Sequence, residues 1–253
     1  MTSKACCTIP PVVSDTDNYQ TQGTYTTISS LRTYAVGPTT SKTGVLVIYD
    51  IFGMDFPQTL QGCDIIGSSG HLVVMPDLFD GAPMDMANFP PDTPEKQQAL
   101  QTFFAGLANP GPMVQKIRAE VLPAVKQTYP AVDRWAVIGY CWGGKIVTLL
   151  SAGEGFAASA QLHPAMLDPA DAAKITIPHF CLSTKDEDAA ATEGFRTVLE
   201  AVKGVVGEKS LVLRWEGTFH GFMAARANLK DKENLEYYEK GYKKLVHFLK
   251  ETL

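Results

Sequence analysis

The sequence feature with the clearest chemical meaning is a glycine-flanked cysteine at position 141. The segment Gly139 to Gly144 lies between an apolar run at 135–138 and a helical pattern at 145–151. A strand that turns directly into a helix crowds its own backbone, and flanking glycines relieve that crowding. The central residue is raised above the helix N-terminus, where N–H groups and the helix dipole stabilise a thiolate. We therefore predict that Cys141 is a catalytic nucleophile rather than a buried structural cysteine.

A thiol nucleophile needs a general base, and the chain has five histidines. His71 precedes its predicted strand, His179 enters a strand early, and His247 lies in the terminal helical pattern. His163 and His220 each follow a predicted strand, so both are expected at the carboxyl edge of a parallel sheet, where catalytic groups gather. His220 lies in a glycine-containing loop and is the predicted base, whereas His163 is a candidate lining residue.

The acid that orients the base is expected where the preceding strand ends. Asp186, Glu187 and Asp188 supply three carboxylates in a row there. Asp186 comes soonest after the strand and is the first choice. Glu187 and Asp188 stay open as alternatives, and at least one of the three is expected to be a solvated turn residue. The chain order of nucleophile, acid and histidine is that of α/β-hydrolases.

Apolar runs that alternate with helical patterns predict the elements that position these groups. The expected strands are 45–49, 72–75, 135–138, 157–162, 177–182 and 210–215, and the main expected helices are 93–107, 113–128, 192–202 and 234–253. This alternation predicts an α/β fold with a mostly parallel central sheet and helices on both faces. We expect one domain over residues 1–253, with Pro123 bending its helix.

The stretch 80–112 interrupts the alternation of strands and helices. It contains six prolines, at positions 83, 90, 91, 94, 110 and 112. Two interpretations stand side by side: a lid over the edge of the sheet, and an ordinary long connection.

Composition limits the classes of partner and cofactor. The 253 residues carry a formal net charge of −5, which leaves no basic excess for binding the phosphates of nucleic acid. No apolar run approaches the roughly 18 residues of a membrane span, and the N-terminus lacks the apolar core of a secretion signal. The five cysteines, at positions 6, 7, 63, 141 and 181, fit no zinc spacing. We expect a cytoplasmic protein with reduced thiols, without metal or cofactor, in which Cys6 and Cys7 are incidental.

The chain resembles the dienelactone hydrolase family from about Thr24 to the C-terminus. The motifs that carry the resemblance are Tyr49-Asp50-Ile51-Phe52-Gly53, Met75-Pro76-Asp77-Leu78-Phe79, the Gly139 to Gly144 turn, and His220-Gly221-Phe222. The resemblance implies an α/β-hydrolase that cleaves an ester or lactone with Cys141, His220 and Asp186. The family's spacing leaves Glu187 open as the acid. It also implies that the N–H groups of Ile51 and Trp142 form the oxyanion hole.

Two departures from the family pattern concern the substrate. Asp50 stands where related enzymes carry a glutamate that holds the resting thiol neutral. The family also uses two arginines to clamp a substrate carboxylate, but Asp80-Gly81 occupies the first position and Arg226 is displaced by two positions from the second. These departures favour a substrate other than dienelactone itself. The side chains expected to line an apolar or aromatic pocket are Phe52, Phe79, Trp142, Phe219 and Phe222, with Asp50 and Arg226 beside them.

Three functions are compatible with these residues. The first is hydrolysis of a small ester or lactone through an acyl-enzyme on Cys141. The second is isomerisation, cyclisation or dehydration of a biosynthetic intermediate in the same pocket. The third is a binding module with an unreactive thiol. We favour the hydrolase, with a small-molecule ester or lactone as the partner and a monomeric or homodimeric protein.

Overall fold

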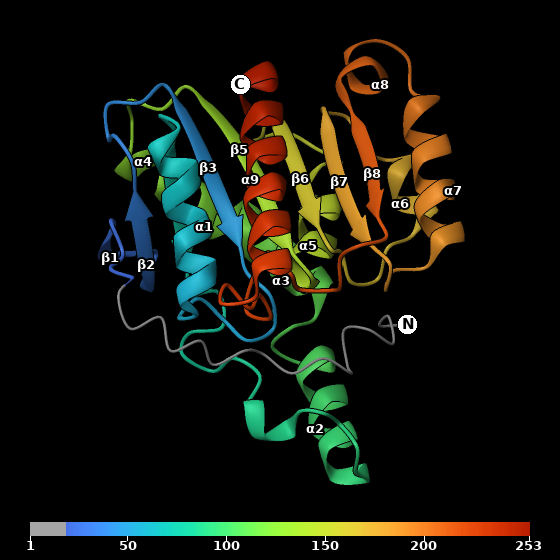
Figure 1. Cartoon of the computed structure of the whole chain (residues 1–253). Helices are drawn as coiled ribbons and strands as arrows, with labels where there is room; N and C mark the ends of the chain where they lie inside the picture. Colours follow the sequence, from blue (N-terminus) through green and yellow to red (C-terminus); the bar gives the residue numbers. More distant parts are fainter. Residues whose placement is uncertain (1–18) are drawn as a thin grey trace.

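The computed structural model describes residues 19–253 and has an eight-stranded sheet at its centre (Figure 1). Its strands are β1 (Thr24–Ile28), β2 (Leu31–Val36), β3 (Thr43–Ile48), β4 (Leu72–Pro76), β5 (Arg134–Tyr140), β6 (Ala158–Leu162), β7 (His179–Thr184) and β8 (Leu211–Trp215). They lie in the order β1-β2-β4-β3-β5-β6-β7-β8. The pairs β1–β2 and β2–β4 are antiparallel, and every other pair is parallel. Cys6 and Cys7 lie outside the described residues.

The predicted fold class is confirmed, and each of the six predicted strands is present. The interior strands are apolar because both of their faces are covered: β4 is buried along its whole length, and β3 is buried from Gly44 onward. The sequence patterns did not predict β1 and β2. Four of the five β1 residues are exposed, so this edge strand has no apolar run to reveal it.

Helices cover both faces of the sheet. The helical elements are α1 (Pro57–Ser68), η2 (Met86–Asn88), α2 (Pro94–Ala105), α3 (Pro110–Lys116), η3 (Ile117–Val121), α4 (Leu122–Thr128), α5 (Trp142–Leu150), α6 (Pro169–Ala172), α7 (Ala189–Glu200), α8 (Val205–Lys209) and α9 (Lys232–Thr252). Figure 1 shows α1 and α9 on the near face and α5 behind the sheet. On the α5 side of the sheet, α3 packs against α5. Helix α6 contacts both α5 and α7.

The predicted helix 113–128 is interrupted in its hydrogen bonding. A π-helical turn, η3, separates α3 from α4, and Pro123 is the second residue of α4. Pro123 has no backbone N–H to donate, and the wider π-helical turn just before it accommodates the missing helical hydrogen bond.

The segment 80–112 leaves the carboxyl edge of the sheet and carries α2, which projects away from the body of the molecule (Figure 1). Its aromatic side chains still contact that edge. The Phe89 ring lies 4.9 Å from that of Phe52, and the Phe103 ring lies 5.0 Å from that of Phe79. The segment therefore contacts the edge at which the site lies, and the lid and the long connection both stay predictions.

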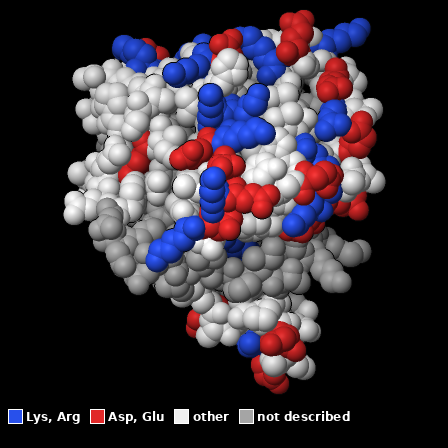
Figure 2. All heavy atoms as spheres, viewed as in Figure 1, with Lys and Arg blue, Asp and Glu red and all other residues white. Residues whose placement is uncertain are grey.

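Basic and acidic side chains are intermingled on the face that α1 and α9 cover (Figure 2). Among the residues that the structure describes, no helix has the length and apolar character that a membrane crossing demands.

Candidate active site

Cys141 stands at the predicted strand-to-helix turn, between the end of β5 and the start of α5. Its backbone has φ 53° and ψ −111°, a left-handed conformation that a residue with a side chain rarely adopts. A Cβ on Gly139 would lie 2.1 Å from the Gly143 oxygen, and a Cβ on Gly143 would lie 2.2 Å from the Ile48 oxygen. Only glycine fits at both positions, so the two glycines allow the turn that raises Cys141.

Neighbouring strands hold the turn in place. The Cys141 N–H donates to the Leu162 oxygen at 3.1 Å, and the Ala165 N–H donates to the Cys141 oxygen at 2.9 Å. These bonds connect the turn to the carboxyl end of β6. Both main-chain polar groups of Cys141 are thus hydrogen-bonded, which fixes the position of the nucleophile.

His220 lies in the loop after β8 and is fully buried. Its Nδ1 lies 2.6 Å from Oε1 of Glu187, and both side chains are almost completely shielded from solvent. Nδ1 therefore donates to the carboxylate, which leaves Nε2 as the ring nitrogen for the thiol. The charge of Cys141 acts on the His220 ring, so the two groups are close neighbours.

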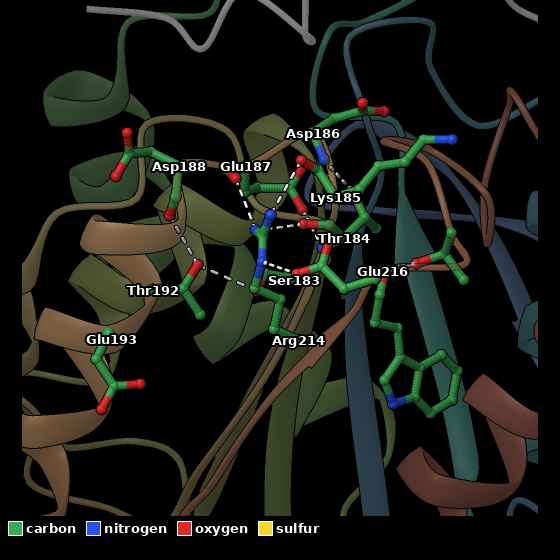
Figure 3. Close-up of polar contacts among 12 residues, drawn as sticks. Ser183, Thr184, Lys185, Asp186, Glu187, Asp188, Thr192, Glu193, Arg214 and Glu216 are labelled. Carbon is green, nitrogen blue, oxygen red and sulfur yellow. Dashed lines mark hydrogen bonds and ion pairs between the residues drawn. The ribbon is translucent and has the colours of Figure 1, made fainter.

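The expectation that Asp186 orients the imidazole is corrected by this geometry. The Asp186 carboxylate accepts instead from the His220 backbone N–H, at 2.8 Å. Glu187 reaches the ring because it lies inward of the turn and has one more methylene, and its second oxygen accepts from the Thr184 N–H. Asp188 caps the N-terminus of α7 by accepting from the Ala191 N–H at 2.7 Å. Asp186 and Glu187 thus bind the backbone and the ring of His220, respectively, whereas Asp188 binds α7. Figure 3 shows how the three side chains lie along this turn.

The charge state of His220 follows from its surroundings. Burial alone would lower the pKa of the imidazole, but the neighbouring Cys141 thiolate and the Glu187 carboxylate outweigh it and raise the pKa to about 9. At neutral pH the ring therefore carries the proton. A protonated imidazole next to the sulfur stabilises the thiolate, which is the reactive form of cysteine.

Asp50 and Arg226 lie together next to this pair. Asp50 is buried, and its two oxygens accept from the N–H groups of Phe52 at 2.9 Å and Ala225 at 3.2 Å. Burial raises the pKa of Asp50 to about 6, against the opposing charge of Arg226, and the Cys141 charge adds to the rise. The Arg226 guanidinium lies 4.8 Å from the centre of the Phe52 ring. The structure thus brings Asp50, Phe52 and Arg226 together beside the thiol.

The candidate oxyanion donors lie on two different elements. Trp142 is the first residue of α5, where the N–H has no intrahelical acceptor four residues earlier. Ile51 follows β3 and is fully buried, and its carbonyl accepts from the Met84 N–H at 2.8 Å. Their oxyanion role stays a prediction.

Aromatic rings surround the site on two sides. The Phe79 ring lies 4.6 Å from the Trp142 ring, and the Trp142 indole N–H donates to the Ala108 oxygen at 2.8 Å. Phe222 is buried on the histidine side, with its ring 5.9 Å from that of His163. Phe219 is only partly buried.

His163 lies next to the candidate base, in surroundings that the sequence did not predict. It is fully buried, with φ 39°, and its ring lies 5.4 Å from that of His220 and 5.8 Å from that of Tyr140. Neither ring nitrogen has a hydrogen-bond partner among residues 19–253. Burial, together with the charges of His220 and Arg226, lowers its pKa well below the usual value. His163 is thus a neutral neighbour of the base.

The remaining histidines lie elsewhere. His71 bonds Thr43 at the amino end of the sheet, at 2.7 Å, and His179 bonds Ser159 inside the sheet, at 2.8 Å. His247 is exposed on α9. Within the described part of the chain, no group of three or more histidine, cysteine, aspartate or glutamate side chains is arranged to hold a metal ion.

Comparison with known proteins gives one consistent result. A family model described as "Dienelactone hydrolase family" matches residues 31–253. An uncharacterised AIM2-family protein of Schizosaccharomyces pombe is 32% identical over 223 residues, which cover 88% of each chain. A mouse carboxymethylenebutenolidase homologue is 23% identical over 228 residues and also covers 88% of each chain. The crystal structure of a dienelactone hydrolase from Anabaena variabilis superposes with a TM-score of 0.57 at 10% identity, over 90% of this chain and 97% of that one.

Proposed function

The chain belongs to the dienelactone hydrolase family and is an ester or lactone hydrolase, and from this premise we propose that it works through a Cys141–His220–Glu187 triad. The observation that carries the proposal is the buried contact of 2.6 Å between His220 Nδ1 and the Glu187 carboxylate, in a ring on which the charge of Cys141 acts. The triad differs from the sequence expectation in one member, because Glu187 replaces Asp186.

The first half of the reaction forms an acyl-enzyme. The Cys141 sulfur attacks the carbonyl carbon of the ester, and the carbonyl π electrons move to the oxygen. The N–H groups of Trp142 and Ile51 donate to this oxyanion, a contribution of about 3 kcal/mol for each donor in comparable enzymes. When the tetrahedral intermediate collapses, the bond to the leaving alcohol breaks and His220 gives its proton to the departing oxygen.

The second half regenerates the thiol. His220, now neutral, takes a proton from water, and the hydroxide attacks the thioester carbon. The carbon–sulfur bond breaks, and the acid product leaves while the Cys141 thiolate pairs again with the His220 ring, which keeps the proton taken from water. Glu187 keeps Nδ1 protonated throughout, so that Nε2 is always the nitrogen that exchanges protons.

The side chains around Cys141 favour a compact, partly aromatic ester or lactone. Phe52, Phe79 and Trp142 supply apolar surface, while the buried Asp50 and Arg226 supply one carboxylate and one cation beside the sulfur. Arg226 is packed over Phe52 and lies close to Asp50. The family's other arginine for clamping a substrate carboxylate is missing, because its position holds Asp80. We therefore expect the substrate to be an ester or lactone other than dienelactone itself. A cytoplasmic location and a monomeric or homodimeric state stay predictions.

The test is a panel of aryl esters and small lactones, hydrolysed by wild type and by Cys141→Ala. We expect Cys141→Ala to lose at least about 10³-fold in kcat for every substrate that the wild type hydrolyses. Intact-mass measurement after quenching should find the acyl group on Cys141. The control is Cys63→Ala, because Cys63 is buried beside Met75, away from the site. Equal rates in wild type and Cys141→Ala would overturn the proposal.

A further inference from the structure

Arg214 is a charged side chain in an otherwise apolar strand, and it lies over the turn that carries Glu187 (Figure 3). One terminal nitrogen donates to the Thr184 oxygen at 2.6 Å and to the Glu187 oxygen at 2.7 Å. The other terminal nitrogen donates to the Lys185 oxygen at 3.1 Å. A single guanidinium thus binds three main-chain carbonyls of one short turn.

These carbonyls lie just beyond the end of β7, where the sheet no longer supplies partners. A guanidinium presents its donors in a rigid, planar fork, so three contacts made at once fix the turn in both position and orientation. A lysine ammonium is a point charge on a flexible stem and cannot reproduce this arrangement.

The turn that Arg214 holds connects twice to the candidate base. Glu187 accepts from His220 Nδ1, and Asp186 accepts from the His220 backbone N–H. Displacement of the turn would therefore move the carboxylate away from the imidazole and loosen the loop on which His220 lies. Charge-assisted bonds of this kind are roughly twice as strong as neutral ones.

A surface ion pair does not account for the arrangement. Arg214 Nε also contacts Glu216 at 2.7 Å, but the Glu216 side chain is 73% exposed, and exposed pairs contribute little. The Arg214 side chain is itself only 17% exposed, because it lies against the turn.

We propose that Arg214 is a positioning residue of the hydrolytic site, which acts by holding Glu187 against His220. This proposal rests on the proposed function, since it has meaning only if the Glu187–His220 contact serves hydrolysis. Arg214 itself contacts neither the thiol nor any group that reacts.

The first test replaces Arg214 with methionine, which keeps the aliphatic stem and removes the donors. We expect kcat for the best ester of the panel to fall about 10- to 100-fold, since small misplacements of catalytic groups have effects of that size. KM should change less than about threefold. The alkaline limb of the pH profile, set by His220 near pH 9, should move to lower pH as the carboxylate withdraws. Arg214→Lys should fall between wild type and Arg214→Met.

The matched control is Arg196→Met. Arg196 lies on α7 at the same edge of the sheet and donates to the Val212 oxygen at 3.3 Å, but it contacts no carbonyl of the turn. It should leave kcat within about twofold and the alkaline limb in place. An equal loss in the Arg196 and Arg214 variants would mean that general loosening of this edge is responsible, and it would overturn the proposal.

A double-mutant cycle separates this proposal from the proposed function. If Arg214 acts through Glu187, replacing it in a Glu187→Gln background should change kcat less than about threefold. The same 10- to 100-fold loss in both backgrounds would overturn the positioning role and leave the triad intact. An unimpaired Glu187→Gln single variant would overturn the triad and this proposal together. Arg214→Lys can carry the same cycle if Arg214→Met does not fold.

Discussion

The two halves of the site are held in place by different forces. At the centre of the sheet, β5 and α5 fix Cys141 through backbone packing, because Gly139 and Gly143 leave no room for a Cβ. At the edge, β7 and β8 fix His220 and Glu187 through side-chain hydrogen bonds within two loops. A substitution in the centre should therefore disturb folding first. A substitution at the edge should disturb chemistry first.

The largest expected effect is on the chemistry of the edge half. Glu187→Gln should lower kcat by about 10³- to 10⁴-fold, because the amide no longer fixes the imidazole tautomer or stabilises the cation. Asp186→Asn should stay within about tenfold, since the amide oxygen can still accept from the His220 backbone N–H. Initial rates with one saturating ester measure both effects. If Asp186→Asn were the more damaging variant, the assignment of the acid would be wrong.

The next effect is on folding in the central half. Gly143→Ala should lower the free energy of unfolding by about 3 kcal/mol or more, because its Cβ would meet the Ile48 oxygen at 2.2 Å. Urea unfolding followed by circular dichroism measures the loss. Gly111→Ala is the control, since the nearest atom to its Cβ is 3.7 Å away. Similar stabilities for the two variants would show that the turn has room that the structure does not show.

A smaller effect is the pH dependence of stability, to which two buried histidines of the edge half contribute with opposite signs. Burial lowers the pKa of His179 on β7 to about 3, so the folded protein keeps this ring neutral. The stability that it contributes is fully present above the unfolded value of about 6.5 and is lost as pH falls toward 3. The loss should be about 1 kcal/mol between pH 6.5 and 5.5 and should approach about 1.4 kcal/mol per pH unit at lower pH. His220 has the opposite sign: its contribution is present below about 6.5 and is lost as pH rises through 9.

Urea unfolding at pH 6.5 and 5.5 measures the acid loss directly. His179→Asn should flatten the acid slope, whereas His247→Asn should leave it unchanged because His247 is exposed on α9. An unaltered slope in His179→Asn would show that the buried ring is already protonated or accessible to water.

The smallest expected effect is the loss of stability when Asp188, the carboxylate that caps α7, is removed. Asp188→Ala should lower the free energy of unfolding by about 1 kcal/mol, because it removes the cap of α7. Its kcat should stay within about twofold of wild type. Thermal unfolding and one rate assay are sufficient, and a large loss of activity would show that Asp188, rather than a helix cap, is part of the relay.

The same contrast explains what the sequence could predict. The strands of the interior and the turn at Cys141 follow from local signals, namely continuous apolar runs and glycines at fixed spacing. The acid could not be selected in this way, because Asp186, Glu187 and Asp188 are adjacent and only the folded turn shows which carboxylate reaches the ring. Arg214 had no local signal beyond its charge within an apolar strand. The exposed strand β1 lacked an apolar pattern altogether.

The most direct test of the central claim is the protonation of the His220 ring, measured by long-range ¹H–¹⁵N spectra of histidine-labelled protein between pH 5 and 10. We expect a ring that is protonated at pH 7 and titrates near pH 9, and a lower His220 pKa in both Cys141→Ala and Glu187→Gln. A His220 ring that is neutral at pH 7, with the same titration in all three proteins, would contradict it.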